Sequence, residues 1–250
     1  MQILTESEII EKIHTQRPFK AAVKSRAYCI KIDRFVPMIC TAIHSGHGLP
    51  LNLRKKSMLS ADERRYEEDP FTEEIISSFP ITIQGLDSRY RYDLNRSPQE
   101  CIYNIAWDKK IWRTKLSRKE REESQSRHAS YYKILECLIT MLEDTFKACV
   151  IYDIHSFNYK RREDTPLFNI GTHFIDRNTF GPVLAHLQKQ LRAVSLPNIE
   201  NRFAFDEVFQ GRGHQASFVH RLHPASLHIP LEIKKVYMDE LTGEAYPLIL

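Results

Sequence analysis

Two short, almost continuously apolar segments, each ending in a His-Ser pair, place the strongest constraint on the fold. Residues 35–43 read FVPMICTAI and run into HSGHG, and residues 149–154 read CVIYDI and run into HSF. Unbroken apolar runs of this length are typical of strands that are buried on both faces of a sheet. The two segments therefore predict covered strands, with His44 and His155 at the points where strand gives way to loop.

Helical and strand-like patterns alternate along the rest of the chain. Apolar residues recur at helical spacing over 131–146 and 179–192, and residues 227–236 alternate between two faces as a strand does. This interleaving predicts an α/β fold whose sheet is covered on both faces. In such folds functional groups collect at the carboxyl ends of strands, so both strand-end histidines are expected in one crevice.

The chain reads as one domain over residues 1–250, because no repeat, linker or change in composition divides it. Residues 113–130 are highly charged and helix-prone, and we expect them to form a charged helical insertion. The five cysteines are widely spaced and contain no Cys-x-x-Cys pair, which argues against a disulfide framework and a cysteine zinc site.

Composition and charge argue against two kinds of partner. The net charge is only +4 and the basic cluster at 160–162 is short, so the basic stripe of a nucleic-acid-binding protein is absent from the sequence. No apolar run approaches the roughly 18–20 residues that a bilayer span needs. The first residues do not follow the pattern of a secretory signal. We expect a cytoplasmic protein that binds neither nucleic acid nor membranes.

A metal site is one interpretation of the two histidines. The segment YEEDP supplies Glu67, Glu68 and Asp69 just before a proline that favours extended backbone. Two imidazoles, one carboxylate and an open position suit metal-assisted hydrolysis. By spacing alone this hypothesis competes with ordinary partly buried histidines, since the chain has eleven.

Six short segments taken together narrow the choice of family. In chain order they are HSGHGLP (44–50), EEDPF (67–71), SRYRYDLNR (88–96), YDIHSF (152–157), NIGT (169–172) and LEIKKVYMD (231–239). In this order they resemble the N-formylglutamate amidohydrolase family, a distant relative of the zinc carboxypeptidases. The resemblance implies a three-layer α/β/α sandwich with a mixed central sheet, of the zinc-carboxypeptidase type. It also implies hydrolysis of a small N-acyl amino acid that bears a carboxylate.

The resemblance further implies one divalent metal ion, Zn²⁺, held by His44 and His155. Asp69 matches the family's acidic ligand best, with Glu68 and His47 as alternates. Carboxypeptidases carry a glutamate three residues after the first histidine, whereas here that residue is His47. The third ligand is therefore less firmly assigned than the two histidines.

The remaining site residues are also implied by the resemblance. Asn95 and Arg96 match a pair that holds the substrate's carboxylate, a role that suits a guanidinium fork. Arg89, from the Ser-Arg-Tyr element, is expected to polarise the scissile carbonyl. Arg212 and His214, in a Gly-Arg-Gly-His loop, are further candidates for binding an anionic substrate.

Glu232 is the expected general base, because the context LEIKK resembles the late strand that carries this residue in carboxypeptidases. A carboxylate within so apolar a strand needs a strong partner. Structural alternatives exist: Glu232 could pair with Lys234, and Arg96 could form an ion pair with Asp93. Asp153 is a candidate acceptor for a metal-binding imidazole.

The sequence thus predicts a metal-dependent amidohydrolase with a small carboxylate substrate. One alternative is a zinc peptidase or a hydrolase of other N-acyl compounds. The other is a ligand-binding or regulatory domain of the same fold without catalytic activity.

Overall fold

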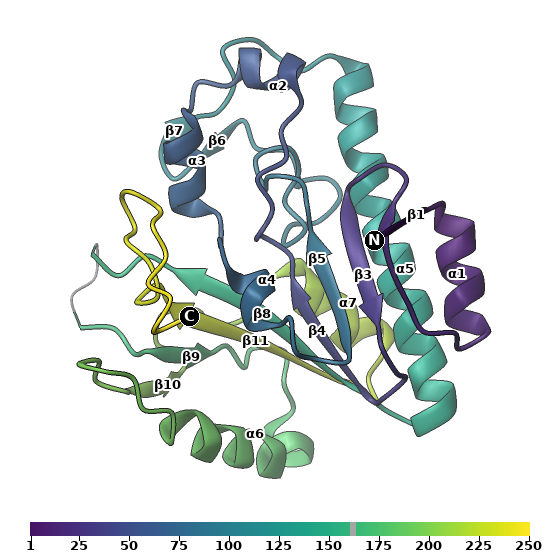
Figure 1. The fold of residues 1–250 in the computed structure, drawn as a ribbon, viewed down its shortest axis with the longest axis vertical. Coiled ribbons are helices and arrows are strands. Elements are labelled where there is room, and N and C mark those ends of the chain that lie inside the picture. Colours follow the sequence, from purple (N-terminus) through teal and green to yellow (C-terminus); the bar gives the residue numbers. More distant parts are fainter. Residues whose placement is uncertain (161–163) are drawn as a thin grey trace.

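A mixed sheet runs through the molecule in the strand order β1-β2-β3-β5-β4-β8-β11-β9-β10 (Figure 1). The structure is a computed structural model that describes residues 1–160 and 164–250. Arg161 and Arg162, which belong to the basic cluster of the sequence, lie outside the described residues.

The sheet is joined by seven helices and a small hairpin in the described ranges. The strands are β1 (Gln2–Leu4), β2 (Phe19–Val23), β3 (Tyr28–Ile32), β4 (Met38–Ala42), β5 (Ile81–Gly85), β8 (Val150–Phe157), β9 (Phe168–Ile170), β10 (Phe203–Phe205) and β11 (Leu227–Lys234). The hairpin pairs β6 (Ile105–Ala106) with β7 (Lys109–Lys110). The helices are α1 (Glu6–His14), α2 (Leu51–Lys56), α3 (Ala61–Glu67), α4 (Thr72–Ile75), α5 (Arg118–Phe146), α6 (Arg177–Arg192) and α7 (His214–Leu222). None of these helices is long and apolar enough to cross a bilayer.

Four neighbouring strands at the centre of the sheet, β5, β4, β8 and β11, run parallel, and β3 and β9 pair with them in the antiparallel sense. Because parallel strands end at the same edge of a sheet, the residues that follow β4 and the last residues of β8 and β11 come together there. The two segments predicted as buried strands correspond to β4 and β8, and the segment predicted as an alternating strand corresponds to β11.

One predicted boundary was wrong. The sequence pattern placed the end of the second strand at Ile154, but β8 continues to Phe157 and includes His155. The cause is β11, whose backbone pairs with β8 as far as Lys234 opposite Phe157 and keeps this polar end extended. His155 therefore projects from a strand, which holds its backbone more firmly than a loop would.

Helices cover both faces, so the three-layer α/β/α arrangement is confirmed. On one face α1, α5 and α7 contribute buried residues such as Ile9, Leu138 and Val219 to a large apolar core. On the other face Ile76, which caps the end of α4, and Leu184 of α6 belong to a smaller core. Figure 1 shows α1 lying beside α5 and α6 lying along β10. Each such aliphatic side chain contributes about 1.5–3 kcal/mol on burial.

The charged residues 113–130 are not separate from the helix predicted over 131–146. Residues 118–130 are the first turns of α5, which begins after a capping box between Ser117 and Glu120. The charged turns are tied to the rest of the domain through Glu120 to Lys56 at 2.7 Å and Arg127 to Asp87 at 2.9 Å. Periodicity in apolar residues could not reveal these turns, because polar contacts hold them.

The NIGT segment anchors the loop that precedes α7. Asn169 is fully buried; its Nδ2 donates to the carbonyl of Phe209 at 2.9 Å, and its Oδ1 accepts from the backbone N–H groups of Glu207 and Val208, each at 3.0 Å. A Cβ on Gly171 would lie 2.1 Å from the backbone nitrogen of Gly211. The loop is thus pressed against the end of β9, and only glycine allows this approach.

We expect Gly171→Ala to lower the free energy of unfolding by about 1–3 kcal/mol, because backbone must move to admit the methyl group. Urea denaturation monitored by circular dichroism measures this change. Gly181→Ala is the matched control, since nothing lies within 4 Å of a Cβ there. Equal stability of the two variants would contradict the close packing of the loop.

Candidate functional site

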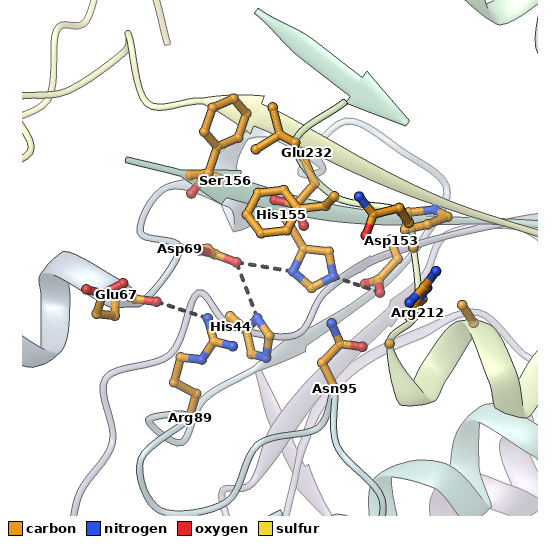
Figure 2. Close-up of a pocket in the computed structure, with 18 of the residues that line it drawn as sticks. His44, Glu67, Asp69, Arg89, Asn95, Asp153, His155, Ser156, Arg212 and Glu232 are labelled. Carbon is orange, nitrogen blue, oxygen red and sulfur yellow. Dashed lines mark hydrogen bonds and ion pairs between the residues drawn. The ribbon is translucent and has the colours of Figure 1, made fainter. Parts of the chain in front are cut away.

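Three side chains from separate parts of the chain meet at the carboxyl edge of the sheet. His44 follows β4, Asp69 follows α3, and His155 projects from β8. Oδ2 of Asp69 lies 3.3 Å from Nδ1 of His44 and 3.2 Å from Nδ1 of His155 (Figure 2). One potential ligand atom from each residue lies within 4.8 Å of the others, and all three residues are buried. These residues could hold a metal ion.

An aspartate holds each imidazole from the side away from the cluster. Nε2 of His44 lies 2.7 Å from Oδ1 of Asp93, and Nε2 of His155 lies 2.9 Å from Oδ2 of Asp153. When Nε2–H donates to a carboxylate, the lone pair of Nδ1 is left to face the cluster. Nδ1 of His44 is buried and makes no hydrogen bond to any described residue. This arrangement is typical of metal-binding histidines, so the donor set fits a zinc ion.

The charges of the cluster shift its pKa values in opposite directions. Burial raises the pKa of Asp69, but the adjacent imidazoles of His155 and His44 outweigh burial and hold that pKa below its usual range. Burial is likewise outweighed at Asp93, where the charge of Arg89 lowers the pKa. Burial lowers the pKa of His155, but the charge of Asp153 outweighs it and raises that pKa. The carboxylates are therefore ionised and ready to bind cations.

The two alternate ligands lie apart from the cluster. The carboxylate of Glu68 accepts a hydrogen bond from Ser88 and lies 2.5 Å from Nδ1 of His47. Backbone at Glu68 is extended, so neighbouring side chains point in opposite directions. Glu67 and Asp69 line the cavity that opens over the three-residue cluster, and Glu68 does not. The structure thus places Asp69, the first choice, beside the histidines.

A cavity of about 390 Å³ opens over the cluster. The site residues predicted from the sequence that line it are His44, Asp69, Arg89, Asn95, Arg96, His155, Arg212 and Glu232. His214 does not line the cavity; its ring packs against Tyr132, with ring centroids 4.8 Å apart. Burial lowers the pKa of His214 to about 4, so this residue is a neutral packing group at neutral pH.

Glu232 projects into the cavity from β11, directly across the strand pair from His155. Lys234, its alternative partner, instead donates to the carbonyl of Thr165. Within residues 1–160 and 164–250, Glu232 forms no ion pair or hydrogen bond. Burial raises its pKa to about 7, and the charge of Asp69 acts in the same direction while that of His155 opposes it.

Arg89 is held rigidly beside the cluster. Its Nη2 and Nε donate to Oδ2 of Asp93 at 2.8 and 3.1 Å, and Nη1 donates to the carbonyl of Glu67 at 3.0 Å. The guanidinium also lies over the ring of Trp107, 4.9 Å from its centroid. Asp93 therefore pairs with Arg89, and the alternative of an ion pair with Arg96 was wrong.

Two arginines at the rim of the cavity remain available. Arg96 and Arg212 are both exposed and line the cavity. Neither has a carboxylate partner in the part of the chain that the structure describes. Asn95 lies against Gly213, where a Cβ would meet the Asn95 side-chain oxygen at 1.8 Å. The rim thus carries uncompensated positive charge next to an amide, which suits a substrate carboxylate.

Sequence reasoning missed two residues that shape the site. Asp93 was considered only as a partner for Arg96, although it lies in the SRYRYDLNR segment and holds His44. Lys235 is 1% exposed, and its Nζ donates to the carbonyls of Tyr66 and Glu68 at 2.9 and 2.7 Å. It thereby fixes the segment that carries Asp69. A lysine directly after an apolar strand gives no signal of such a role.

The α/β/α sandwich is an α/β domain whose cavity, lined by imidazoles and carboxylates, lies at the carboxyl ends of the parallel strands, where such folds bind their ligands. The sequence profile of N-formylglutamate amidohydrolase matches residues 36–238. The chain therefore belongs to the N-formylglutamate amidohydrolase family, a family of hydrolases.

Solved structures support the fold. The chain is 17% identical to N-formylglutamate amidohydrolase from Ralstonia eutropha JMP134, with a TM-score of 0.68 over 88% of this chain and 90% of that one. It is 18% identical to the gene product Atu2144 from Agrobacterium tumefaciens, with a TM-score of 0.65 over 89% of this chain and 88% of that one. No curated protein sequence matches the chain.

We expect Asp93→Asn to lower the free energy of unfolding by about 3–5 kcal/mol at pH 7, because it leaves Arg89 buried without its counter-charge. Urea denaturation measures the loss, and Asp108→Asn, at an exposed position, is the control. The pKa of Asp93 is depressed in the folded state. Ionised Asp93 therefore contributes to the free energy of unfolding above its unfolded-state pKa of about 3.9, and this contribution is lost as the pH falls below that value. The difference between variant and wild type should therefore narrow below about pH 4. If the free energies of unfolding of variant and wild type differed by the same amount above and below about pH 4, an ionised, paired Asp93 would be contradicted.

Proposed function

We propose that this chain hydrolyses the amide bond of a small N-acyl amino acid that bears a carboxylate, such as N-formylglutamate, and that it uses one zinc ion. The observation that carries the proposal is the convergence of His44, Asp69 and His155 in a cavity that Glu232 also lines. Membership of the N-formylglutamate amidohydrolase family supports the reaction and the substrate class.

The donor set of two imidazole nitrogens and one carboxylate oxygen suits zinc, and His44, Asp69 and His155 would hold it. When bound, zinc supplies a Lewis acid that polarises the amide carbonyl and lowers the pKa of water towards neutrality. The other tasks of hydrolysis, which are proton transfer and substrate positioning, fall to side chains of this chain.

Glu232 is the proposed proton carrier. Its carboxylate accepts the proton of the attacking water and returns a proton to the amide nitrogen as the C–N bond breaks. The products are the free acid of the acyl group and the amino acid. A pKa of about 7 is close to the value at which one group serves as both base and acid near neutral pH.

The arginines position the substrate. Arg212 and Arg96 bind its carboxylate through charge-assisted hydrogen bonds, with the Asn95 amide beside them. Arg89, held in place by Asp93, stabilises the negative charge that develops on the carbonyl oxygen. Binding that fixes the amide against these groups lowers the activation barrier, because the entropic cost of orienting the reacting atoms is already met in the bound complex.

We expect Glu232→Gln to lower kcat for formate release from N-formylglutamate by about 10²–10⁴-fold, because the side-chain amide of glutamine cannot accept the proton of the attacking water. Zinc content, measured by inductively coupled plasma mass spectrometry, should stay equal to that of wild type. The exposed Glu244→Gln is the control.

Unchanged turnover in metal-replete Glu232→Gln would eliminate Glu232 as the base. A panel of N-acyl amino acids and short peptides addresses the alternatives. Preference for peptides would favour a peptidase. Zinc binding without turnover of any compound would favour a ligand-binding domain.

We expect Arg212→Gln to raise KM for N-formylglutamate by about 10–100-fold and to leave kcat nearly unchanged. Loss of a charge-assisted hydrogen bond to the carboxylate weakens the binding of the substrate and of the transition state by the same amount. Steady-state kinetics measure both constants. Arg192→Gln, at the exposed end of α6, controls for the loss of one positive charge. An unaltered KM would show that Arg212 does not contact the carboxylate.

A further inference from the structure

Asp153, the acceptor for His155, is itself held by a buried hydroxyl. Its Oδ1 accepts a hydrogen bond from Oγ1 of Thr41 at 2.6 Å, while its Oδ2 faces Nε2 of His155 at 2.9 Å. Thr41 lies in β4 directly opposite Asp153 in the register of the sheet. Thr41 is fully buried and Asp153 is 1% exposed, so water does not compete for these bonds.

Gln215 closes this layer of polar groups from the helix above it. The side chain comes from α7 and is fully buried. Its Nε2 lies 2.9 Å from Oγ1 of Thr41 and 3.2 Å from Nε2 of His228, and its Oε1 accepts from the hydroxyl of Tyr131 at 2.7 Å. One amide thus links α5, α7, β4 and β11.

The directions of these hydrogen bonds are determined by the chemistry of the groups. Ionised Asp153 can only accept, so the hydroxyl of Thr41 donates to it and must accept from Gln215. The amide then has its oxygen free for the hydroxyl of Tyr131, which matches the observed orientation. The chain of donors runs from Gln215 through Thr41 to Asp153, and leaves Asp153 oriented to accept from Nε2 of His155.

Gln215 also anchors the segment that carries Arg212, the proposed contact to the substrate carboxylate. Arg212 lines the cavity immediately before α7, and Gln215 lies in the first turn of that helix. The backbone N–H of His214 also donates to the carbonyl of Asn95 at 3.2 Å. The start of α7 is therefore fixed both to the substrate side and to the histidine side of the cavity.

We propose that Gln215 is a positioning residue for the metal site: through Thr41 and Asp153 it fixes His155 with Nδ1 directed at the cluster. Gln215 contacts neither the three candidate ligands nor the cavity. This inference rests on the proposed zinc site, and it assigns a role to a residue outside that site.

The test is zinc affinity, measured by competition with a chromophoric chelator. Gln215→Met keeps the length of the side chain and removes its hydrogen bonds, and Thr41→Val removes the hydroxyl. Both variants should bind zinc about 10–100-fold more weakly than wild type, the loss usual when the partners of ligand histidines are removed. Thr41→Ser retains the hydroxyl and should restore the affinity.

Ser226→Ala separates positioning from stability. Ser226 is buried and donates to Oε1 of Glu143 at 2.6 Å, an equivalent hydroxyl–carboxylate bond at the opposite end of β11. Removing it should lower the free energy of unfolding of the metal-free protein about as much as Thr41→Val does, by about 1–3 kcal/mol. Zinc affinity should not change in Ser226→Ala.

The outcomes distinguish the two proposals. If wild type binds zinc and Gln215→Met binds it equally tightly, the positioning role of Gln215 is wrong, whatever Thr41→Val does, and the proposed function stands. If Gln215→Met does not fold, the pair Thr41→Val and Thr41→Ser decides the question. If wild type binds no divalent ion, both proposals fail.

Discussion

The site depends on two hydrogen bonds between buried imidazoles and buried aspartates, His44 to Asp93 and His155 to Asp153. Burying a carboxylate costs several kcal/mol unless partners compensate it. Asp93 is compensated by Arg89, and Asp153 by Thr41 as well as by its histidine. Each imidazole is consequently held through its Nε2, the ring nitrogen that points away from the cluster. The remaining nitrogen is directed at Asp69 by the protein rather than by any bound group.

Charge is distributed so that each part of the cavity suits a different task. Acidic and imidazole groups lie together at the sheet, where a cation would compensate the carboxylates. The guanidinium groups of Arg96 and Arg212, which have no carboxylate partner among residues 1–160 and 164–250, lie exposed at the rim. Glu232 lines the same cavity beside His155, and its burial raises its pKa to about 7. Under the proposed function, these charges orient an N-acyl amino acid with its carboxylate towards the rim and its amide towards the cluster.

The elements that the sequence predicted well are those set by local periodicity. Strands β4 and β11 and the apolar half of α5 follow from runs and spacings of side chains, because burial acts on each residue separately. The sequence did predict a charged helix before residue 131, but not that it is continuous with the rest of α5, and it did not predict the polar end of β8. Glu120 and Arg127 find their partners in distant segments, and β8 is extended by pairing with β11. Contacts of this kind have no trace in a local pattern.

The sequence by itself determined the family and the α/β class, and it pointed to most of the charged residues that line the cavity, since these depend on residue types in a fixed order. The tertiary structure alone decided which acid meets the histidines, because the extended backbone at Glu68 turns Asp69 towards them and directs the buried Glu68 towards Ser88 and His47. It also decided that His214 packs against Tyr132 and that Arg89, rather than Arg96, neutralises Asp93. Side-chain direction and long-range pairing are properties of the folded backbone, and only the folded backbone reveals them.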